Sequence, residues 1–172
     1  GLINLLKTLP KNSNPMDVIQ LAVSSLGTYY PIKFDAEELK ANKYTMDYYI
    51  AVSAGIIGSI GSIVAAWNRI KNNKAYIKPD NQLSYAENFM HMLDDSIKVT
   101  PLINRIIDAT LILHAEHTIN ASTFTAMVTS STLASPTQVI ASAIGSLSGP
   151  LHGGANQKVI LIIQIIIVAM NM

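Results

Sequence analysis

The chain has 172 residues, of which 49% are hydrophobic and 13% are charged, and its net charge is +1. Soluble domains usually carry about 25% charged residues, so this chain is either largely buried in a bigger structure or partly in a membrane. Lys and Arg form no cluster, which argues against nucleic acid as a partner. Since the chain contains no cysteine, disulfides and thiolate metal sites are excluded.

Helix start and stop signals divide most of the chain. Asn14-Pro15 predicts the start of a helix with apolar residues at helical spacing, and Gly27 is expected to end it. A second helix is predicted over residues 45–72. Three more starts are indicated by the capping box Ser84–Glu87, by Thr100-Pro101 and by Ser135-Pro136, with the last helix closed by Gly149-Pro150. Because no alternating strands or Asn-Gly hairpin signals are present, the sequence predicts an all-α fold.

The uncharged segment Tyr48–Trp67 has roughly the length of a membrane-spanning helix. It contains three serines and three glycines, and its flanks, Asp47 and Arg69, show no positive-inside bias. We therefore expect a soluble helix that is buried on all sides, and no membrane association. A small helical membrane protein is the alternative from another class. Because the helix is rich in small and apolar residues, Thr45–Lys71 is also the candidate for a subunit interface.

Three of the four histidines lie between residues 114 and 152. His114 and His117 are one helical turn apart, so both can project to the same side of a helix. His152 follows the helix stop at Gly149-Pro150, and Gly153-Gly154 allow the backbone to approach a ligand closely. If a new helix begins there, its N-terminal field disfavours imidazolium. A neutral His152 can then donate a hydrogen bond to a carbonyl oxygen that becomes an enolate oxygen.

Metal binding is the competing interpretation, because His114, His117 and His152 offer three imidazoles. The metalloprotease pattern His-Glu-x-x-His is absent, since Glu116 directly precedes His117. We therefore predict no metal site, and we expect His114 to make a supporting hydrogen bond behind the residues that contact substrate.

Three motifs resemble the citrate synthase family in its bacterial-type form, in both order and spacing. They are His114-Ala115-Glu116-His117, Asn120-Ala121-Ser122-Thr123 and Gly149-Pro150-Leu151-His152-Gly153-Gly154-Ala155-Asn156. The resemblance identifies residues 1–158 as part of the family's large helical domain. Residues 159–172 form an apolar tail that departs from the family pattern, which suggests a shifted reading frame.

This resemblance implies condensation of acetyl-CoA with oxaloacetate to citrate and CoA, the entry step of the tricarboxylic acid cycle. It implies a homodimer and no cofactor besides the acetyl-CoA substrate. His152 is the implied catalytic residue, which hydrogen-bonds the thioester carbonyl during enolisation, and His117 is the implied ligand of oxaloacetate. The other implied site residues are Leu151 and Gly153 near the thioester, with His114 and Asn120 behind them.

The family's catalytic aspartate, third histidine and oxaloacetate-binding arginines follow the Gly-Gly-Ala-Asn motif, and no residue of this chain matches them. We therefore expect a fragment, truncated at both ends and inactive by itself. 2-Methylcitrate synthase, which uses propionyl-CoA, is the alternative because the sequence does not separate the two acyl groups. A cytoplasmic location is expected, with an organelle left open.

Overall fold

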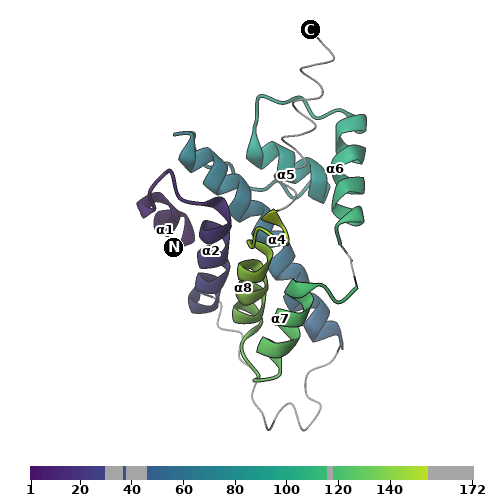
Figure 1. Ribbon diagram of the computed structural model, residues 1–172. Helices are drawn as coiled ribbons and strands as arrows, with labels where there is room; N and C mark the ends of the chain where they lie inside the picture. The colour runs from purple at the N-terminus through teal and green to yellow at the C-terminus, as the bar shows by residue number, and fades with distance from the viewer. Residues whose placement is uncertain (30–36, 38–45, 116–117, 155–172) are drawn as a thin grey trace.

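The computed structural model describes residues 1–29, 37, 46–115 and 118–154 (Figure 1). Within these residues there is no strand, which confirms the all-α prediction. The helices are α1 (Leu2–Thr8), α2 (Pro15–Tyr29), α4 (Met46–Lys71), α5 (Tyr85–Leu93), α6 (Pro101–Leu113), α7 (Ala121–Ser130) and α8 (Pro136–Leu147). The boundary at residue 158 and the apolar tail lie outside the described residues, so both stay predictions.

Three of the predicted helix starts carry the expected side-chain caps. At α2 the Asn14 Oδ1 atom accepts a hydrogen bond from the Met16 amide at 2.9 Å. The Ser84 hydroxyl accepts a hydrogen bond from the Glu87 amide, and the Ser84 amide donates to the Glu87 carboxylate, so the capping box at α5 is confirmed. Hydrogen bonds from the Ser84 hydroxyl and amide also lower the pKa of Glu87. Thr100 caps α6 by accepting from the Ile103 amide at 3.3 Å. By contrast, Ser135 makes no side-chain cap at α8.

Gly27 does not end α2, so that prediction is wrong. The helix continues through Gly27 to Tyr29, and none of the described glycines has a positive φ. A Cβ atom added at Gly27 would lie 2.7 Å from the Thr137 Oγ1 atom on α8. Gly27 therefore serves the close approach of α2 and α8, because a larger side chain would hold the two helices apart.

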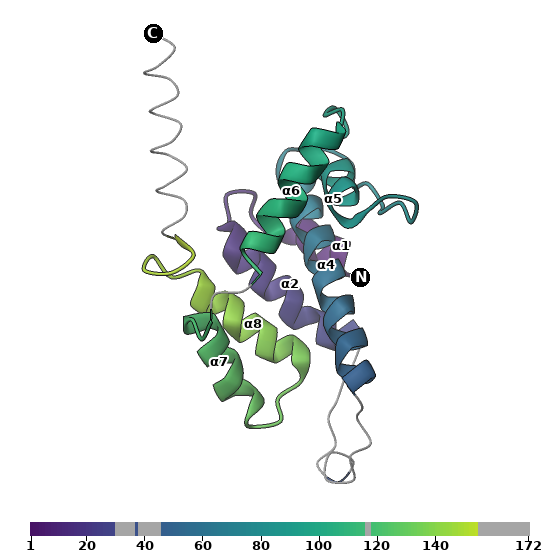
Figure 2. The ribbon, with the colours of Figure 1, turned by 90° about the vertical axis from the view of Figure 1, so that its right-hand side faces the viewer.

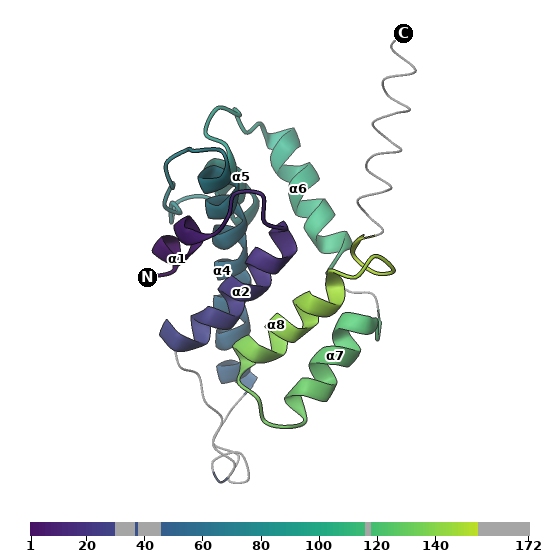
Figure 3. The ribbon, with the colours of Figure 1, turned by 60° about the vertical axis from the view of Figure 1, so that its left-hand side comes forward.

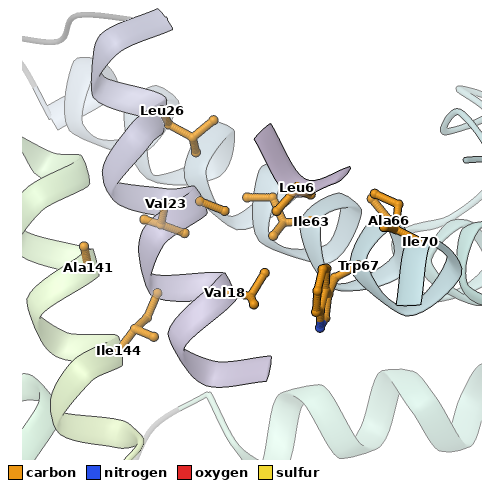
Figure 4. Packing of buried hydrophobic residues seen from close by; sticks show 11 residues of the cluster. Leu6, Val18, Val23, Leu26, Ile63, Ala66, Trp67, Ile70, Ala141 and Ile144 are labelled. Carbon is orange, nitrogen blue, oxygen red and sulfur yellow. The ribbon is translucent and has the colours of Figure 1, made fainter. Parts of the chain in front are cut away.

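The helices form a row in which α2 lies between α4 and α8, and α7 packs on the outer side of α8 (Figures 2 and 3). α5 packs on α4, and α6 packs on α5. The core joins side chains of α1, α2, α4 and α8 (Figure 4): Leu6, Val18, Ala22, Val23, Leu26, Ile63, Ala66, Trp67, Ile70, Ala141 and Ile144. This shared core anchors α8 to the rest of the molecule, and α8 in turn carries the loop that contains His152.

The expectation that the glycine-rich helix is buried on all sides is wrong for its first half. In α4, Ile50 and Ile57 are exposed, whereas most residues from Gly61 to Ile70 are buried. The C-terminal half of α4 shares the core with α1 and α2, and its Ser62 and Asn68 hydrogen-bond to Met92 and Leu93 of α5. By contrast, Cβ atoms added at Gly55 and Gly58 in the first half would meet no atom within 4 Å. By length and composition α4 could cross a membrane, but one such helix is weak evidence, since core helices of soluble proteins have the same properties.

One buried charge lies at the C-terminal end of α4. Arg69 is 5% exposed, its Nη1 atom lies 2.9 Å from Asp95 Oδ1, and its Nε atom donates to the Ala75 carbonyl. A buried guanidinium needs such partners, because leaving it unpaired costs much of its hydration energy. The Arg69–Asp95 pair therefore ties the chain that follows α5 back to α4.

Candidate active site

The hairpin of α7 and α8 brings His152 next to the start of α7. The two helices pack side by side, with α7 beginning at the end of the hairpin where α8 finishes (Figure 3). Their connection includes Leu133, which has φ 60 and whose amide donates to the Ser130 carbonyl at 2.9 Å. The open end of the hairpin therefore combines the first turn of α7 with the loop that follows α8.

The side chain of His152 contacts Ser122, which lies in the first turn of α7. The His152 Nε2 atom is 2.9 Å from the Ser122 Oγ atom, and both residues are half-buried. If the serine donates, a neutral ring carries its proton on Nδ1, and if the serine accepts, Nε2 carries a proton. In either arrangement Ser122 constrains the orientation of the imidazole. Only when the serine donates does the neutral ring keep a free N–H, on Nδ1, that can donate to a carbonyl oxygen.

The backbone of the loop after α8 folds back on the helix end. The Gly149 carbonyl accepts from the His152 amide at 3.0 Å and from the Gly154 amide at 3.1 Å. The Gly153 amide donates to the Leu147 carbonyl at 2.9 Å, and a Cβ atom at Gly153 would lie 2.5 Å from that oxygen. Glycine is thus required at residue 153 by a close backbone approach inside the loop. That Gly153 also lies near a thioester stays a prediction.

Other predicted site residues occupy the edges of this region. Leu151 is 100% exposed, and its place beside a thioester stays a prediction. Asn120 is the N-cap of α7, since its Oδ1 atom accepts from the Thr123 amide at 2.9 Å. Asn120 therefore fixes the start of the helix that carries Ser122, and its role behind the substrate-contacting residues stays a prediction.

The predicted relation between His114 and His117 is not supported by a common helix. α6 ends at Leu113, His114 is its C-cap, and Thr118 has φ 55, in the left-handed region. The exposed His114 ring has its Nδ1 atom 2.7 Å from the Thr110 carbonyl oxygen. His117 and Glu116 lie outside the described residues, so the role of His117 stays a prediction.

Reasoning from the sequence missed α7 and, with it, Ser122. Phe124, Met127 and Val128 do follow helical spacing, so periodicity could have indicated α7, although none of its residues is buried in the structure. A further signal in the sequence was Asn120, because asparagine is a preferred N-cap residue. In the structure its side chain accepts a hydrogen bond from the amide of Thr123, three residues later. Placing that cap would have put Ser122 in a first helical turn, although its contact with His152 depends on the tertiary fold.

The described residues contain no group of three His, Asp or Glu side chains that could hold a metal ion. The three-imidazole alternative includes His117, which is not among them. An apolar cavity of about 460 Å³ lies between α4 and the α7–α8 connection, lined by residues such as Ile56, Leu133 and Ile140. None of the predicted site residues lines this cavity, and the only ionisable side chain among its lining residues is Tyr49.

Comparison with known proteins gives one consistent result. The family model described as "Citrate synthase, C-terminal domain" matches residues 1–170. A citrate synthase of Acidithiobacillus ferridurans is 44% identical over 93% of this chain and 40% of its own length. The 2-methylcitrate synthase 1 of Corynebacterium glutamicum is 37% identical over 92% of this chain and 41% of its own length.

The solved structures agree with the sequences. The citrate synthase of Pyrobaculum aerophilum has a TM-score of 0.73 and 33% identity, covering 91% of this chain and 39% of that one. The chain thus spans about two fifths of the length of the curated relatives it matches.

Proposed function

This chain belongs to the citrate synthase family, and from that premise we propose that it supplies part of a site that condenses acetyl-CoA with oxaloacetate. A base removes a proton from the acetyl methyl group, and the electron pair moves onto the thioester oxygen. The enol carbon then attacks the ketone carbon of oxaloacetate to form the new C–C bond. Water cleaves the resulting thioester, which gives citrate and free CoA.

His152 is the proposed donor to the thioester oxygen. The observation that carries this role is the 2.9 Å contact between His152 Nε2 and Ser122 Oγ, which holds a half-buried imidazole at the open end of the α7–α8 hairpin. A preorganised donor to an oxyanion contributes about 10²–10³-fold to kcat. His117 is the proposed ligand of oxaloacetate, and Leu151 and Gly153 are proposed to lie beside the thioester.

We infer from the family resemblance that the base and the oxaloacetate-binding arginines are supplied by positions that no residue of this chain matches. Positioned acid–base groups contribute about 10²–10⁴-fold, and groups that act as a set lose most of their effect when one is missing. We therefore propose that the 172-residue chain alone forms no citrate. Citrate production by the purified chain would refute this point.

The proposed reaction is tested by the release of CoA thiol from acetyl-CoA and oxaloacetate, using the product of the complete gene. We expect turnover in the parent and a loss of about 10²-fold or more in His152→Ala. Equal rates in the two proteins would remove His152 from the mechanism, and no turnover with either acyl-CoA would remove the proposed reaction itself.

The second candidate is 2-methylcitrate synthesis, which the relative from Corynebacterium glutamicum favours. One extra methylene in the acyl group changes binding by only about 1–3 kcal/mol, so both substrates can be turned over at different rates. The same assay with propionyl-CoA in place of acetyl-CoA decides between them. A higher kcat/KM for propionyl-CoA would assign the protein to this second reaction.

We also propose a homodimer, located in the cytoplasm, in which the first half of α4 contributes to the interface. Ile50 and Ile57 are 58% and 57% exposed there, and Gly55 and Gly58 leave open space above the helix. Small residues allow a second helix to approach closely, and an exposed apolar face favours burial between subunits. Sedimentation of the complete gene product should give a dimer that Gly58→Arg dissociates, and a monomeric parent would refute the proposal.

A further inference from the structure

We propose that the hydrogen bond between Thr129 and Ser142 is a positioning contact, which fixes α7 on α8 and thereby sets the contact between Ser122 and His152. The Thr129 Oγ1 atom lies 2.9 Å from the Ser142 Oγ atom, and both residues are half-buried. The catalytic meaning of this contact rests on the proposed function, whereas its effect on the His152 ring does not.

The positions of the two contacts link them mechanically. Ser122 and Thr129 are seven residues apart, so they lie about two turns apart on the same face of α7. Their partners lie on α8 and on the loop that follows it, which places both contacts along one seam of the hairpin. A rotation of α7 that separates Thr129 from Ser142 therefore also carries Ser122 away from His152.

α7 has few other anchors. α8 is its main packing partner, and none of its residues is buried. Its large apolar side chains, Phe124, Met127 and Val128, are more than half exposed. α8, in contrast, is held in the core by Ala141 and Ile144. A helix with so little apolar burial depends more strongly on interhelical hydrogen bonds for its register, because their directionality specifies one arrangement.

A substitution at Thr129 can remove the bond to Ser142 without leaving a hydroxyl proton unpaired. Thr129 Oγ1 also lies 2.9 Å from the Thr125 carbonyl, and Ser142 Oγ lies 2.7 Å from the Val139 carbonyl. Each hydroxyl has one proton, so the hydroxyl that donates across the helices does not donate to the carbonyl of its own helix. When Thr129 is replaced by valine, Ser142 can still donate to Val139, and no donor loses its partner. Thr129→Val therefore removes the interhelical bond while keeping the side-chain shape.

The test is an NMR measurement of the His152 ring nitrogens in the 172-residue chain without substrate. The ¹⁵N shift of Nε2 reports its protonation and hydrogen bonding, and Ser122→Ala gives the reference shift for a lost contact. We expect Thr129→Val to move the Nε2 shift toward that reference and Thr129→Ser to keep the parent value. Thr125→Val is the matched control, since its hydroxyl donates to the Ala121 carbonyl within α7 at 2.8 Å.

The inference is overturned if folded Thr129→Val keeps the parent Nε2 shift, or if Thr125→Val changes it equally. Should Thr129→Val fail to fold, Ser142→Ala removes the same bond from α8 and carries the same expectation. Because no substrate is present, these outcomes do not depend on the proposed reaction. An absence of CoA release by the complete gene product would refute that reaction and leave the ring measurement unaffected.

Discussion

Replacing Gly153 by alanine tests whether the loop that carries His152 depends on a close backbone approach. A Cβ atom at residue 153 would lie 2.5 Å from the Leu147 carbonyl oxygen and 2.8 Å from Leu147 Cδ1. Because the obstacle is backbone rather than the end of a flexible side chain, the loop must move, and the 2.9 Å bond from the Gly153 amide is lost. Forced repacking costs about 1–3 kcal/mol. The lost hydrogen bond adds about 0.5–1.5 kcal/mol.

The free energy of unfolding of Gly153→Ala should therefore fall by roughly 1.5–4.5 kcal/mol, and each kcal/mol lowers Tm by about 2–4 °C in a chain of this size. Thermal unfolding followed by circular dichroism measures the change. Gly149→Ala is the control in the same loop, since its Cβ would lie an acceptable 3.4 Å from the Ser146 carbonyl oxygen. Equal Tm values for the parent and Gly153→Ala would show that the loop tolerates a side chain and that this reasoning is wrong.

Three further predictions concern the packing, the pH dependence and the site. Gly27→Ala should lower the free energy of unfolding by about 1–3 kcal/mol, because its Cβ would lie 2.7 Å from the Thr137 hydroxyl on α8. Gly55→Ala adds a Cβ in open space and should raise the free energy of unfolding of the dilute chain by about 1 kcal/mol. Urea unfolding measures both changes. The hydrogen bond from Arg69 lowers the pKa of Asp95, so the folded state binds this proton less readily than the unfolded state. The parent should be more stable than Asp95→Asn by the largest amount near neutral pH, and this difference should shrink as the pH falls below about 4. A difference that does not change with pH would contradict this prediction. Ser122→Ala should lower CoA release by roughly 10²-fold through misplacement of His152, and an unchanged rate would show that Ser122 does not position the ring.

Local signals in the sequence were sufficient where the structure itself is local. The caps at Ser84 and Thr100 act within one helical turn, so their sequence patterns predict the starts of α5 and α6. Gly27 was misinterpreted because glycine serves both helix termination and close helix packing, and only the position of α8 distinguishes them. The burial of α4 was mispredicted for a similar reason, because composition does not show which half of a helix is covered by its neighbours.

The candidate site was predictable only in part. The histidine motifs and the glycine-rich loop pointed to His152, because their order and spacing resemble a known family. The contact with Ser122 was not predictable, since it joins the first turn of a helix without buried residues to a loop 30 residues later. Helical spacing did not reveal that α6 ends one residue before His114, and the relation of His114 to His117 stays a prediction.

The most direct test of the account is a calorimetric titration of the complete gene product with oxaloacetate. We expect the parent to bind oxaloacetate, His117→Ala not to bind it, and His152→Ala to retain binding, because the proposed partner of His152 is the thioester. Loss of binding in His117→Ala alone would support His117 as the ligand of oxaloacetate and show that His152 is not needed for this binding. A folded parent that binds no oxaloacetate would contradict the proposed function and leave the histidine motifs as elements of the fold.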